Sequence, residues 1–302
     1  MTTHLPFTHL AKPLTIGVVG LGSMGQRYAK IFSNHPEIVI HGCDPRGDKD
    51  DLFNPQTGWQ FLSVEELVHK VPLNVVAIAV PASQHLAVLR TVKEAHPKCA
   101  VLLEKPVSDH ALSEDERAWC LQLQGLNAVG YNWRFHPFAK QLWKAREDIC
   151  NLTLHVAQDM REWPSKTYCD PLREFSHELD LVQHLTESPV IASSRLHQNE
   201  WLNESEATRY EIQGHHKRGQ WKVSILPFAK ARVRWIRVQM SDGAEVFREW
   251  EQTEDIIDAM YRNEAQQLLD AYLHDRSSQD LTCSLRDALD TTRLIDEAER
   301  PI

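Results

Sequence analysis

Short apolar runs and longer amphipathic segments alternate through the first 130 residues of the chain. The apolar runs are continuous, which is typical of parallel strands that are covered on both faces. We expect these strands at residues 14–20, 37–43, 74–80, 99–103 and 127–131. Helices are expected between them at residues 23–34 and 84–96, and S-x-x-E capping boxes at Ser63 and Ser113 begin two more. Strands alternating with helices predict a parallel sheet.

The pattern changes after a helix that is expected at residues 137–149. Residues 151–158 alternate between apolar and polar positions, and one helix is expected at residues 176–186. Further strands are then expected with no long helices between them, at residues 190–196, 207–213, 220–226, 231–240 and 244–250. Such a run of strands predicts an antiparallel sheet with one covered face, before the last ~50 residues return to helix.

These patterns predict an α/β protein with two domains, which suits a length of 302 residues. Residues 1–130 are expected to form a doubly wound parallel sheet of the Rossmann type that binds a dinucleotide. Residues 131–302 are expected to form an α+β domain with a large, mostly antiparallel open sheet.

A glycine motif follows the first predicted strand. Gly20, Gly22 and Gly25 form G-x-G-x-x-G, and Ser23 and Met24 lie at the start of the helix that follows. Such glycines permit the tight turn, the approach of a pyrophosphate and close packing of helix on strand. The free N–H groups of the helix start then face the anion. The alternative is a glycine-rich turn without a ligand, but the chain has only 12 glycines and concentrates them here.

An acidic residue ends the second predicted strand. Asp44 lies 19 residues after Gly25, where a carboxylate can bind an adenosine ribose and repel a 2′-phosphate. This position favours NAD over NADP. Arg46 lies two residues further on and could bind a 2′-phosphate instead, so NADP stays possible.

Charge and composition exclude several classes of protein. With 33 Lys and Arg against 42 Asp and Glu, the net charge is −9, so no basic surface for nucleic acid is expected. Residues 75–80 are among the longest apolar runs and fall far short of a membrane span, and residues 1–13 do not resemble a secretory signal. The six cysteines include no C-x-x-C pair. The chain is therefore expected in the cytoplasm, with no membrane or nucleic-acid partner.

Several segments together resemble the Gfo/Idh/MocA family of oxidoreductases. They read VVAIAVPASQH at 75–85, LLEKPVS at 102–108, YNWRFHP at 131–137, SHELDLVQHL at 176–185, YRNEAQQLLDAY at 261–272 and CSLRDALDTTRLI at 283–295. The resemblance implies an NAD(P)-linked oxidation or reduction at a carbon of a sugar, cyclitol or related polyol. It also implies that residues 131–302 bind substrate and form a homodimer or homotetramer through the C-terminal sheet.

The resemblance also implies roles for individual residues on the cofactor side. Pro81 and His85 fall in the segment after the third strand, and Glu104 and Lys105 match the family's E-K-P. Lys105 would face both nicotinamide and substrate, where an ammonium can stabilise a developing alkoxide. The alternative for this lysine is an exposed surface residue.

The family's N-x-R is matched by Asn132 and Arg134, which the resemblance places near the nicotinamide. For Arg134 a structural ion pair is the alternative.

His177 resembles the family's histidine in the helix that lines the substrate site, where a neutral imidazole suits a general acid/base. The sequence departs from the family pattern before it, because Arg173 stands where many members carry an acid and Glu174 follows. The usual glycine-rich approach is replaced by a stretch that contains Trp163 and Tyr168. Together with Arg173, Glu174 and Asp180, these two aromatic residues are the expected substrate-binding set.

A metal site is the alternative for the same helix. His177, Asp180 and His184 share one face at helical spacing and could ligate a metal. No convincing further ligand accompanies them, and the stripe equally suits the polar face of an amphipathic helix. We therefore expect no metal.

Three functions remain open from the sequence. The first is an NAD(P)-dependent dehydrogenase or reductase in which Lys105 stabilises the alkoxide and His177 moves the proton. The second is a lyase or glycosidase that oxidises its substrate only transiently and regenerates NAD. The third is a regulatory protein that senses dinucleotide without catalysis, which the unusual Arg173 motivates.

Overall fold

The computed structural model describes residues 13–47, 58–162, 170–187, 194–202 and 205–299. The chain divides into two compact units. The first unit comprises residues 1–108, 118–130 and 261–285, and the second comprises 109–117, 131–260 and 286–302. The chain passes from the first unit to the second after residue 130, where the sequence predicts the domain boundary. In addition, residues 109–117 belong to the second unit and residues 261–285 to the first.

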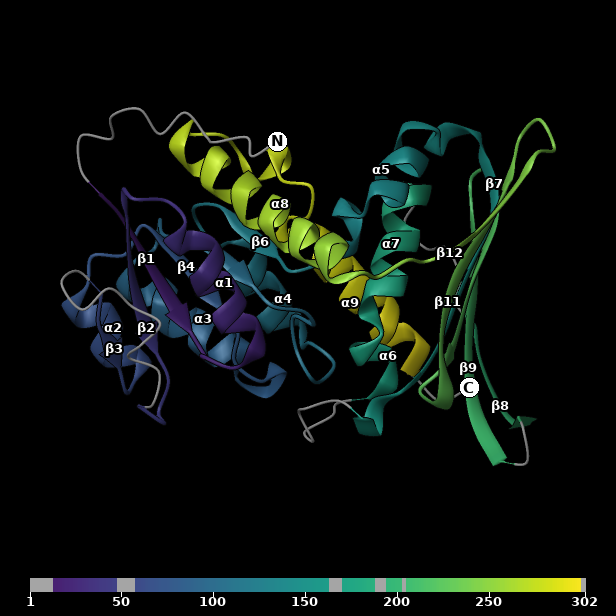
Figure 1. The fold of residues 1–302 in the computed structure, drawn as a ribbon, viewed down its shortest axis with the longest axis horizontal. Coiled ribbons are helices and arrows are strands. Elements are labelled where there is room, and N and C mark those ends of the chain that lie inside the picture. The colour runs from purple at the N-terminus through teal and green to yellow at the C-terminus, as the bar shows by residue number, and fades with distance from the viewer. Residues whose placement is uncertain (1–12, 48–57, 163–169, 188–193, 203–204, 300–302) are drawn as a thin grey trace. The chain divides into compact units, whose positions relative to one another are not determined.

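The first unit contains a six-stranded parallel sheet (Figure 1). Its strands are β1 (Leu14–Val19), β2 (Ile38–Cys43), β3 (Gln60–Phe61), β4 (Val75–Ile78), β5 (Ala100–Leu103) and β6 (Asn127–Val129). They lie in the order β3-β2-β1-β4-β5-β6, so the direction of winding reverses between β1 and β4. In sheets of this order a ligand binds at the carboxyl ends of the strands beside that reversal.

Helices cover both faces of this sheet. The helices with residues in the first unit are α1 (Ser23–Ser33), α2 (Val64–Lys70), α3 (His85–Ala95), α4 (Glu114–Leu121) and α8 (Glu254–Leu273). Tyr28 and Phe32 of α1 join Leu268 of α8 in the core on one face. Ser63 Oγ and Ser113 Oγ each cap their helix by accepting a hydrogen bond from the backbone N–H three residues later, at 3.2 Å. The Glu116 carboxylate also accepts from the Ser113 N–H at 2.9 Å, which confirms the capping box at Ser113.

The second unit contains a second six-stranded sheet. Its strands are β7 (Ile149–Asp159), β8 (Ser194–Leu202), β9 (Ser205–His216), β10 (Gly219–Leu226), β11 (Phe228–Met240) and β12 (Glu245–Glu249). The strand order is β12-β11-β7-β10-β9-β8. Only β7 and β10 pair in parallel, so the prediction of a mostly antiparallel sheet is confirmed.

Helices pack against one face of the second sheet (Figure 1). They are α5 (Pro137–Lys144), α6 (Pro171–Glu174), α7 (Ser176–Thr186) and α9 (Leu285–Glu299). Leu181 and Ile295 from these helices join Leu154 and Ile236 of the sheet in one core. On the opposite face His155 stacks on Trp235 at 5.0 Å, and no helix among the described residues of this unit covers it.

Short 3-10 turns occur in both units, and one of them corrects an expected boundary. Among the described residues, η2 (Ala82–Gln84) and η6 (Ser278–Asp280) lie in the first unit. The second unit contains η3 (Asn132–Phe135), η4 (Arg146–Asp148) and η5 (Met160–Glu162). The helix expected at residues 137–149 ends at Lys144, because η4 follows and Ile149 already pairs in β7.

The cysteines of the described residues are thiols rather than disulfides, and Cys43, Cys99, Cys120 and Cys283 are buried. Cys169 lies outside the described residues. Within the part of the chain that the structure describes, no helix has the length and apolar character needed to cross a membrane.

Candidate functional site

The glycine turn joins β1 to α1 at the carboxyl edge of the parallel sheet. Gly20 has φ +85°, and a Cβ there would lie 2.6 Å from the Ala79 carbonyl oxygen. A Cβ on Gly25 would lie 1.8 Å from the Gly20 carbonyl oxygen. By contrast, a Cβ on Gly22 would meet nothing within 4 Å. The fold therefore requires glycine at the first and third positions, whereas the second glycine leaves open space beside the helix start.

The first turn of α1 presents backbone donors to that space. Gly22 is the N-cap residue and supplies no side-chain hydrogen bond, and the first turn carries no acidic residue. The first N–H groups of a helix have no partner within the helix. Those of Ser23 and Met24 belong to this group, and together with the helix dipole they suit a phosphate.

Asp44 lies at the end of β2 and is tied to the glycine turn. Its Oδ2 accepts a hydrogen bond from the Leu21 N–H at 2.9 Å. The Arg46 guanidinium donates to both oxygens of the same carboxylate at 2.9 Å, and the Arg46 backbone N–H adds a third bond at 3.0 Å. These bonds from Arg46 hold the pKa of Asp44 well below its usual range. Asp44, which favours NAD, and Arg46, which could bind the 2′-phosphate of NADP, are therefore bonded to each other.

The segments that follow β4 and β5 are joined by His85. Its side chain is buried, with Nε2 at 2.9 Å from the Val80 carbonyl oxygen and Nδ1 at 2.7 Å from that of Pro106. Pro81 is the N-cap residue of the intervening turn η2. The ring of His85 thus braces the two segments that end at the sheet's carboxyl edge, one of which carries Lys105.

Glu104 and Lys105 follow β5 directly. The Glu104 carboxylate is buried and accepts hydrogen bonds from the Tyr28 hydroxyl at 2.8 Å and from the Lys105 backbone N–H at 3.2 Å. Burial raises the pKa of Glu104, while Tyr28 and Lys105 oppose that effect. Lys105 is half-buried, so it is not the exposed surface lysine of the alternative interpretation.

In the second unit, Arg134 forms a buried ion pair. Its Nε and Nη2 donate to Asp180 at 2.8 and 2.7 Å, and the two side chains are 5% and 0% exposed. Thr291 Oγ1 donates to the same carboxylate at 3.3 Å. Burial raises the pKa of Asp180, and the charge of Arg134 acts against it. Asn132, also predicted as a site residue, is buried in the same turn η3.

His177 lies in the first turn of α7 against aromatic rings. The Trp133 indole stacks on the imidazole at 5.4 Å with 5° between the planes, and the Tyr131 ring meets it edge-on at 5.7 Å. Trp250 also stacks on Trp133, at 5.0 Å. The ring plane of His177 is therefore set by Trp133, a residue that the sequence did not single out although it lies inside N-x-R.

A cavity of about 440 Å³ lies further along α7 and is not part of this aromatic group. Trp143, His184, Asp287 and Asp290 are among its lining residues, and His177 is not. Its wall includes His184 stacked on Trp143 at 4.0 Å. Burial lowers the pKa of His184 to about 2, so this imidazole is neutral near pH 7.

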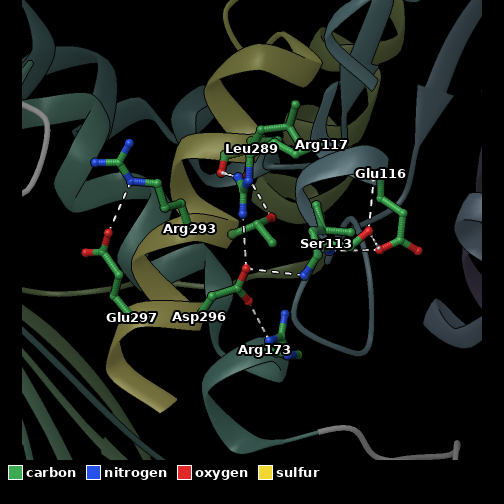
Figure 2. A network of polar contacts seen from close by, with 11 residues as sticks. Ser113, Glu116, Arg117, Arg173, Leu289, Arg293, Asp296 and Glu297 are labelled. Carbon is green, nitrogen blue, oxygen red and sulfur yellow. Dashed lines mark hydrogen bonds and ion pairs between the residues drawn. The ribbon is translucent and has the colours of Figure 1, made fainter. Parts of the chain in front are cut away.

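Arg173 points toward α9 rather than away from the protein (Figure 2). Its side chain is 1% exposed, and Nη2 donates to Asp296 Oδ1 at 2.7 Å. Asp296 Oδ2 also accepts from Arg117 Nη2 at 3.1 Å and from the Leu112 N–H at 3.3 Å. This network fastens α6 to α9, immediately before the helix that carries His177. Glu174, the last residue of α6, is half-buried.

The three residues of the metal alternative do not converge. Asp180 bonds Arg134, His184 stacks on Trp143 and His177 stacks on Trp133. Within the described residues, no group of three or more His, Cys, Asp or Glu side chains is arranged to hold a metal ion.

The structure thus brings the predicted residues together in two sets. The first unit holds the glycine turn with Asp44, Arg46, Pro81, His85, Glu104 and Lys105, and the second holds Asn132, Arg134, Arg173, Glu174, His177 and Asp180. Trp163 and Tyr168 lie outside the described residues. Sequence reasoning missed Tyr28, Trp133 and Asp296. The position of Tyr28, one helical turn after Gly25, is the signal that could have indicated the first.

Comparisons with known proteins support an oxidoreductase. Residues 14–121 match the model of the Gfo/Idh/MocA family, which is described as an oxidoreductase family with an NAD-binding Rossmann fold. No curated protein matches the chain. The match to this family confirms the expected Rossmann domain with NAD as its cofactor.

Solved structures resemble the chain over nearly its whole length. Apo scyllo-inositol dehydrogenase from Lactobacillus casei is 15% identical with a TM-score of 0.76, covering 95% of this chain and 96% of that one. UDP-N-acetylglucosamine 3-dehydrogenase GnnA from Acidithiobacillus ferrooxidans is 17% identical with a TM-score of 0.71, covering 95% of each chain. GenD2 from gentamicin A biosynthesis, in complex with NAD, is 18% identical with a TM-score of 0.72, covering 96% and 94%. At these identities the likeness is one of fold.

Proposed function

Because residues 14–121 match the model of the Gfo/Idh/MocA family of NAD-binding oxidoreductases, we propose that the chain moves a hydride between NAD and a hydroxyl-bearing carbon. The substrate class is a cyclitol, a sugar or a sugar derivative, as in the names of the inositol and UDP-sugar dehydrogenases that share the fold. The observation that carries the proposal is the glycine turn, in which Gly22 leaves an open space before an uncapped helix.

The residues of the first unit fit a dinucleotide. The N–H groups of Ser23 and Met24 would bind the pyrophosphate, and Gly22 leaves it room. The Asp44 carboxylate would accept hydrogen bonds from the adenosine ribose. Pro81, His85, Glu104, Asn132 and Arg134 would shape the nicotinamide end, directly or by holding the backbone.

The chemistry needs one hydride and one proton to leave the alcohol. When bound, NAD⁺ accepts the hydride from the carbon. The His177 imidazole would take the hydroxyl proton, and the Lys105 ammonium would stabilise the alkoxide that develops on the oxygen. The products are then a carbonyl compound, NADH and a protonated histidine that passes its proton to water. Trp133 would hold the imidazole plane during the transfer.

Purified protein incubated with NAD⁺ and a panel of cyclitols and sugars tests this proposal. We expect NADH to form in a one-to-one ratio with a carbonyl product for at least one compound. Product formed without NADH would instead indicate the transient oxidation of a lyase or glycosidase. Tight NAD binding with no product across the panel would indicate the regulatory alternative.

Gly22→Ala is expected to leave the stability of the protein unchanged and to weaken NAD binding by about tenfold or more. The added methyl meets no protein atom within 4 Å, but it occupies the space that the pyrophosphate needs. The measurements are thermal unfolding without cofactor and a fluorescence titration with NADH. Gly25→Ala is the contrasting variant and should destabilise the fold, because its Cβ would overlap the Gly20 carbonyl. Wild-type NADH affinity in Gly22→Ala would argue against this cradle.

Asp44→Ser is expected to move cofactor preference from NAD toward NADP. The substitution removes a carboxylate that repels a 2′-phosphate and releases the Arg46 guanidinium from its ion pair. The ratio of kcat/KM for NAD to that for NADP should fall by about tenfold or more. Arg46→Ser in the same background should cancel the gain for NADP. An unchanged ratio in Asp44→Ser would show that this carboxylate does not set the choice.

We further propose that the uncovered face of the second sheet joins copies of the chain into a homodimer or homotetramer. Val233 and Phe247 on this sheet are 39% and 51% exposed. Light scattering on the purified protein measures the oligomeric state directly.

We also propose a cytoplasmic location, with small-molecule substrates and no nucleic-acid partner. The net charge of −9 and the thiol cysteines support it.

A further inference from the structure

Two buried carboxyl groups meet one tyrosine hydroxyl behind Lys105. Tyr28 Oη lies 2.8 Å from Glu104 Oε1 and 3.2 Å from Glu264 Oε2. The three residues are 0%, 7% and 4% exposed. They come from α1, from the segment that follows β5 and from α8, and all belong to the first unit.

If both carboxyl groups are ionised, a single hydroxyl hydrogen must serve two acceptor contacts. A tyrosine hydroxyl has one hydrogen to donate, and an ionised carboxylate can only accept. If Tyr28 donates to Glu104, the contact with Glu264 brings two oxygen atoms together with no hydrogen between them. The same holds with the two glutamates exchanged. A proton on one carboxyl group resolves this, because that group then donates to the Tyr28 oxygen.

Burial also favours a proton on one of the two carboxyl groups. Two like charges in one buried site raise the cost of ionising the second group. Burial raises the pKa of Glu104, and burial followed by the nearby glutamates raises that of Tyr28 well above its usual value, so the phenol keeps its hydrogen. The counter-charge of Lys105 lowers the pKa of Glu104 but does not reverse the shift.

Other charged and titratable groups lie near the cluster. On α1 the guanidinium of Arg27 lies over the Tyr261 ring at 5.1 Å, and on α8 that ring meets Tyr28 edge-on at 5.7 Å. From the segment after β5, Lys105 donates its backbone N–H to Glu104 Oε2 at 3.2 Å. The cluster is therefore bonded directly to the backbone of the proposed catalytic lysine.

We propose that Glu104 and Glu264 share a single proton across the Tyr28 hydroxyl, so that the three side chains together carry one negative charge beside Lys105. At alkaline pH the shared proton leaves, and a second negative charge arises beside the lysine. That charge offsets the ammonium and weakens its hold on an alkoxide. This second consequence rests on the proposed role of Lys105, whereas the shared proton itself does not.

Infrared spectra of the cofactor-free protein test the shared proton. In D₂O at neutral pH, the difference between wild type and Glu264→Gln should contain the C=O stretch of a protonated carboxyl group. The glutamine amide N–H replaces the shared proton as donor to Tyr28, so the variant should unfold at the wild-type temperature. Glu65→Gln is the matched control at an exposed glutamate, and its difference spectrum should contain carboxylate bands alone. A Glu264→Gln difference with carboxylate bands alone would overturn the proposal.

The pH profile of kcat/KM tests the link to Lys105. We expect the wild-type value to fall as the pH rises through the loss of the shared proton, and we expect Glu264→Gln to lack this fall. An identical alkaline fall in both proteins would overturn the link. Because the infrared test needs no substrate, it stands even if the proposed reaction fails.

Discussion

Lys105→Met is expected to lower kcat for the preferred alcohol by about 10²-fold or more. Methionine keeps the length and apolar stem of the side chain but removes the ammonium that would stabilise the alkoxide. Lys105 lies two residues after β5, at the carboxyl edge where the glycine turn also lies. Initial rates of NADH formation under saturating NAD⁺ measure the effect.

Lys98→Met is the matched control for this substitution, because Lys98 is an exposed lysine of the same unit. Its kcat should stay within about twofold of the wild-type value, as is usual for surface substitutions away from a site. Both variants should bind NADH with wild-type affinity in a fluorescence titration. Near-normal turnover in Lys105→Met would rule out the proposed role of the ammonium.

Asp180→Ala is expected to lower the free energy of unfolding by about 3–5 kcal/mol, because it leaves the Arg134 charge buried and unpaired. The pair is bidentate, at 2.7 and 2.8 Å, and both side chains are 5% exposed or less. Urea unfolding followed by tryptophan fluorescence measures the change. Asp180→Asn should lose less, because its amide oxygen still accepts one bond from the guanidinium.

Glu187→Ala provides the comparison at a more exposed ion pair. Glu187 and Arg146 are 32% and 26% exposed, and breaking such a pair costs at most about 1 kcal/mol. Similar losses in Asp180→Ala and Glu187→Ala would mean that Arg134 finds another partner. That result would favour the proposed contact of Arg134 with the cofactor over a structural role for its ion pair with Asp180.

The elements of the fold could largely be predicted because their signals are local. Continuous apolar runs gave the buried parallel strands, and the capping boxes at Ser63 and Ser113 placed the starts of two helices within a residue. The pairing of strands, in contrast, leaves no local signal in the sequence. Alternating residues in β7 and β10 show which face is buried but not which strand lies beside it, so their parallel pairing could not be predicted.

The candidate site likewise contains residues with local sequence signals and residues whose partners are distant in the sequence. The role of Gly25 follows from the Gly20 carbonyl, a partner five residues away. Gly20 packs against the distant Ala79 carbonyl, but its place in G-x-G-x-x-G already indicates the turn. The partner of Arg173 is Asp296, which is 123 positions away in the sequence, so a residue expected at the substrate is found in a buried network. The stacking of His177 on Trp133 likewise depends on how η3 packs against α7. Long-range pairs of this kind leave no spacing signal in one sequence.

Hydride transfer can be followed with an isotope. The substrate found by the panel is prepared with deuterium on the carbon that bears the reacting hydroxyl, and the nicotinamide is recovered after turnover for mass spectrometry. One deuterium in the reduced nicotinamide for each carbonyl product, with NAD⁺ consumed in equal amount, is the predicted result. Product that forms while the nicotinamide stays oxidised and unlabelled would contradict net hydride transfer.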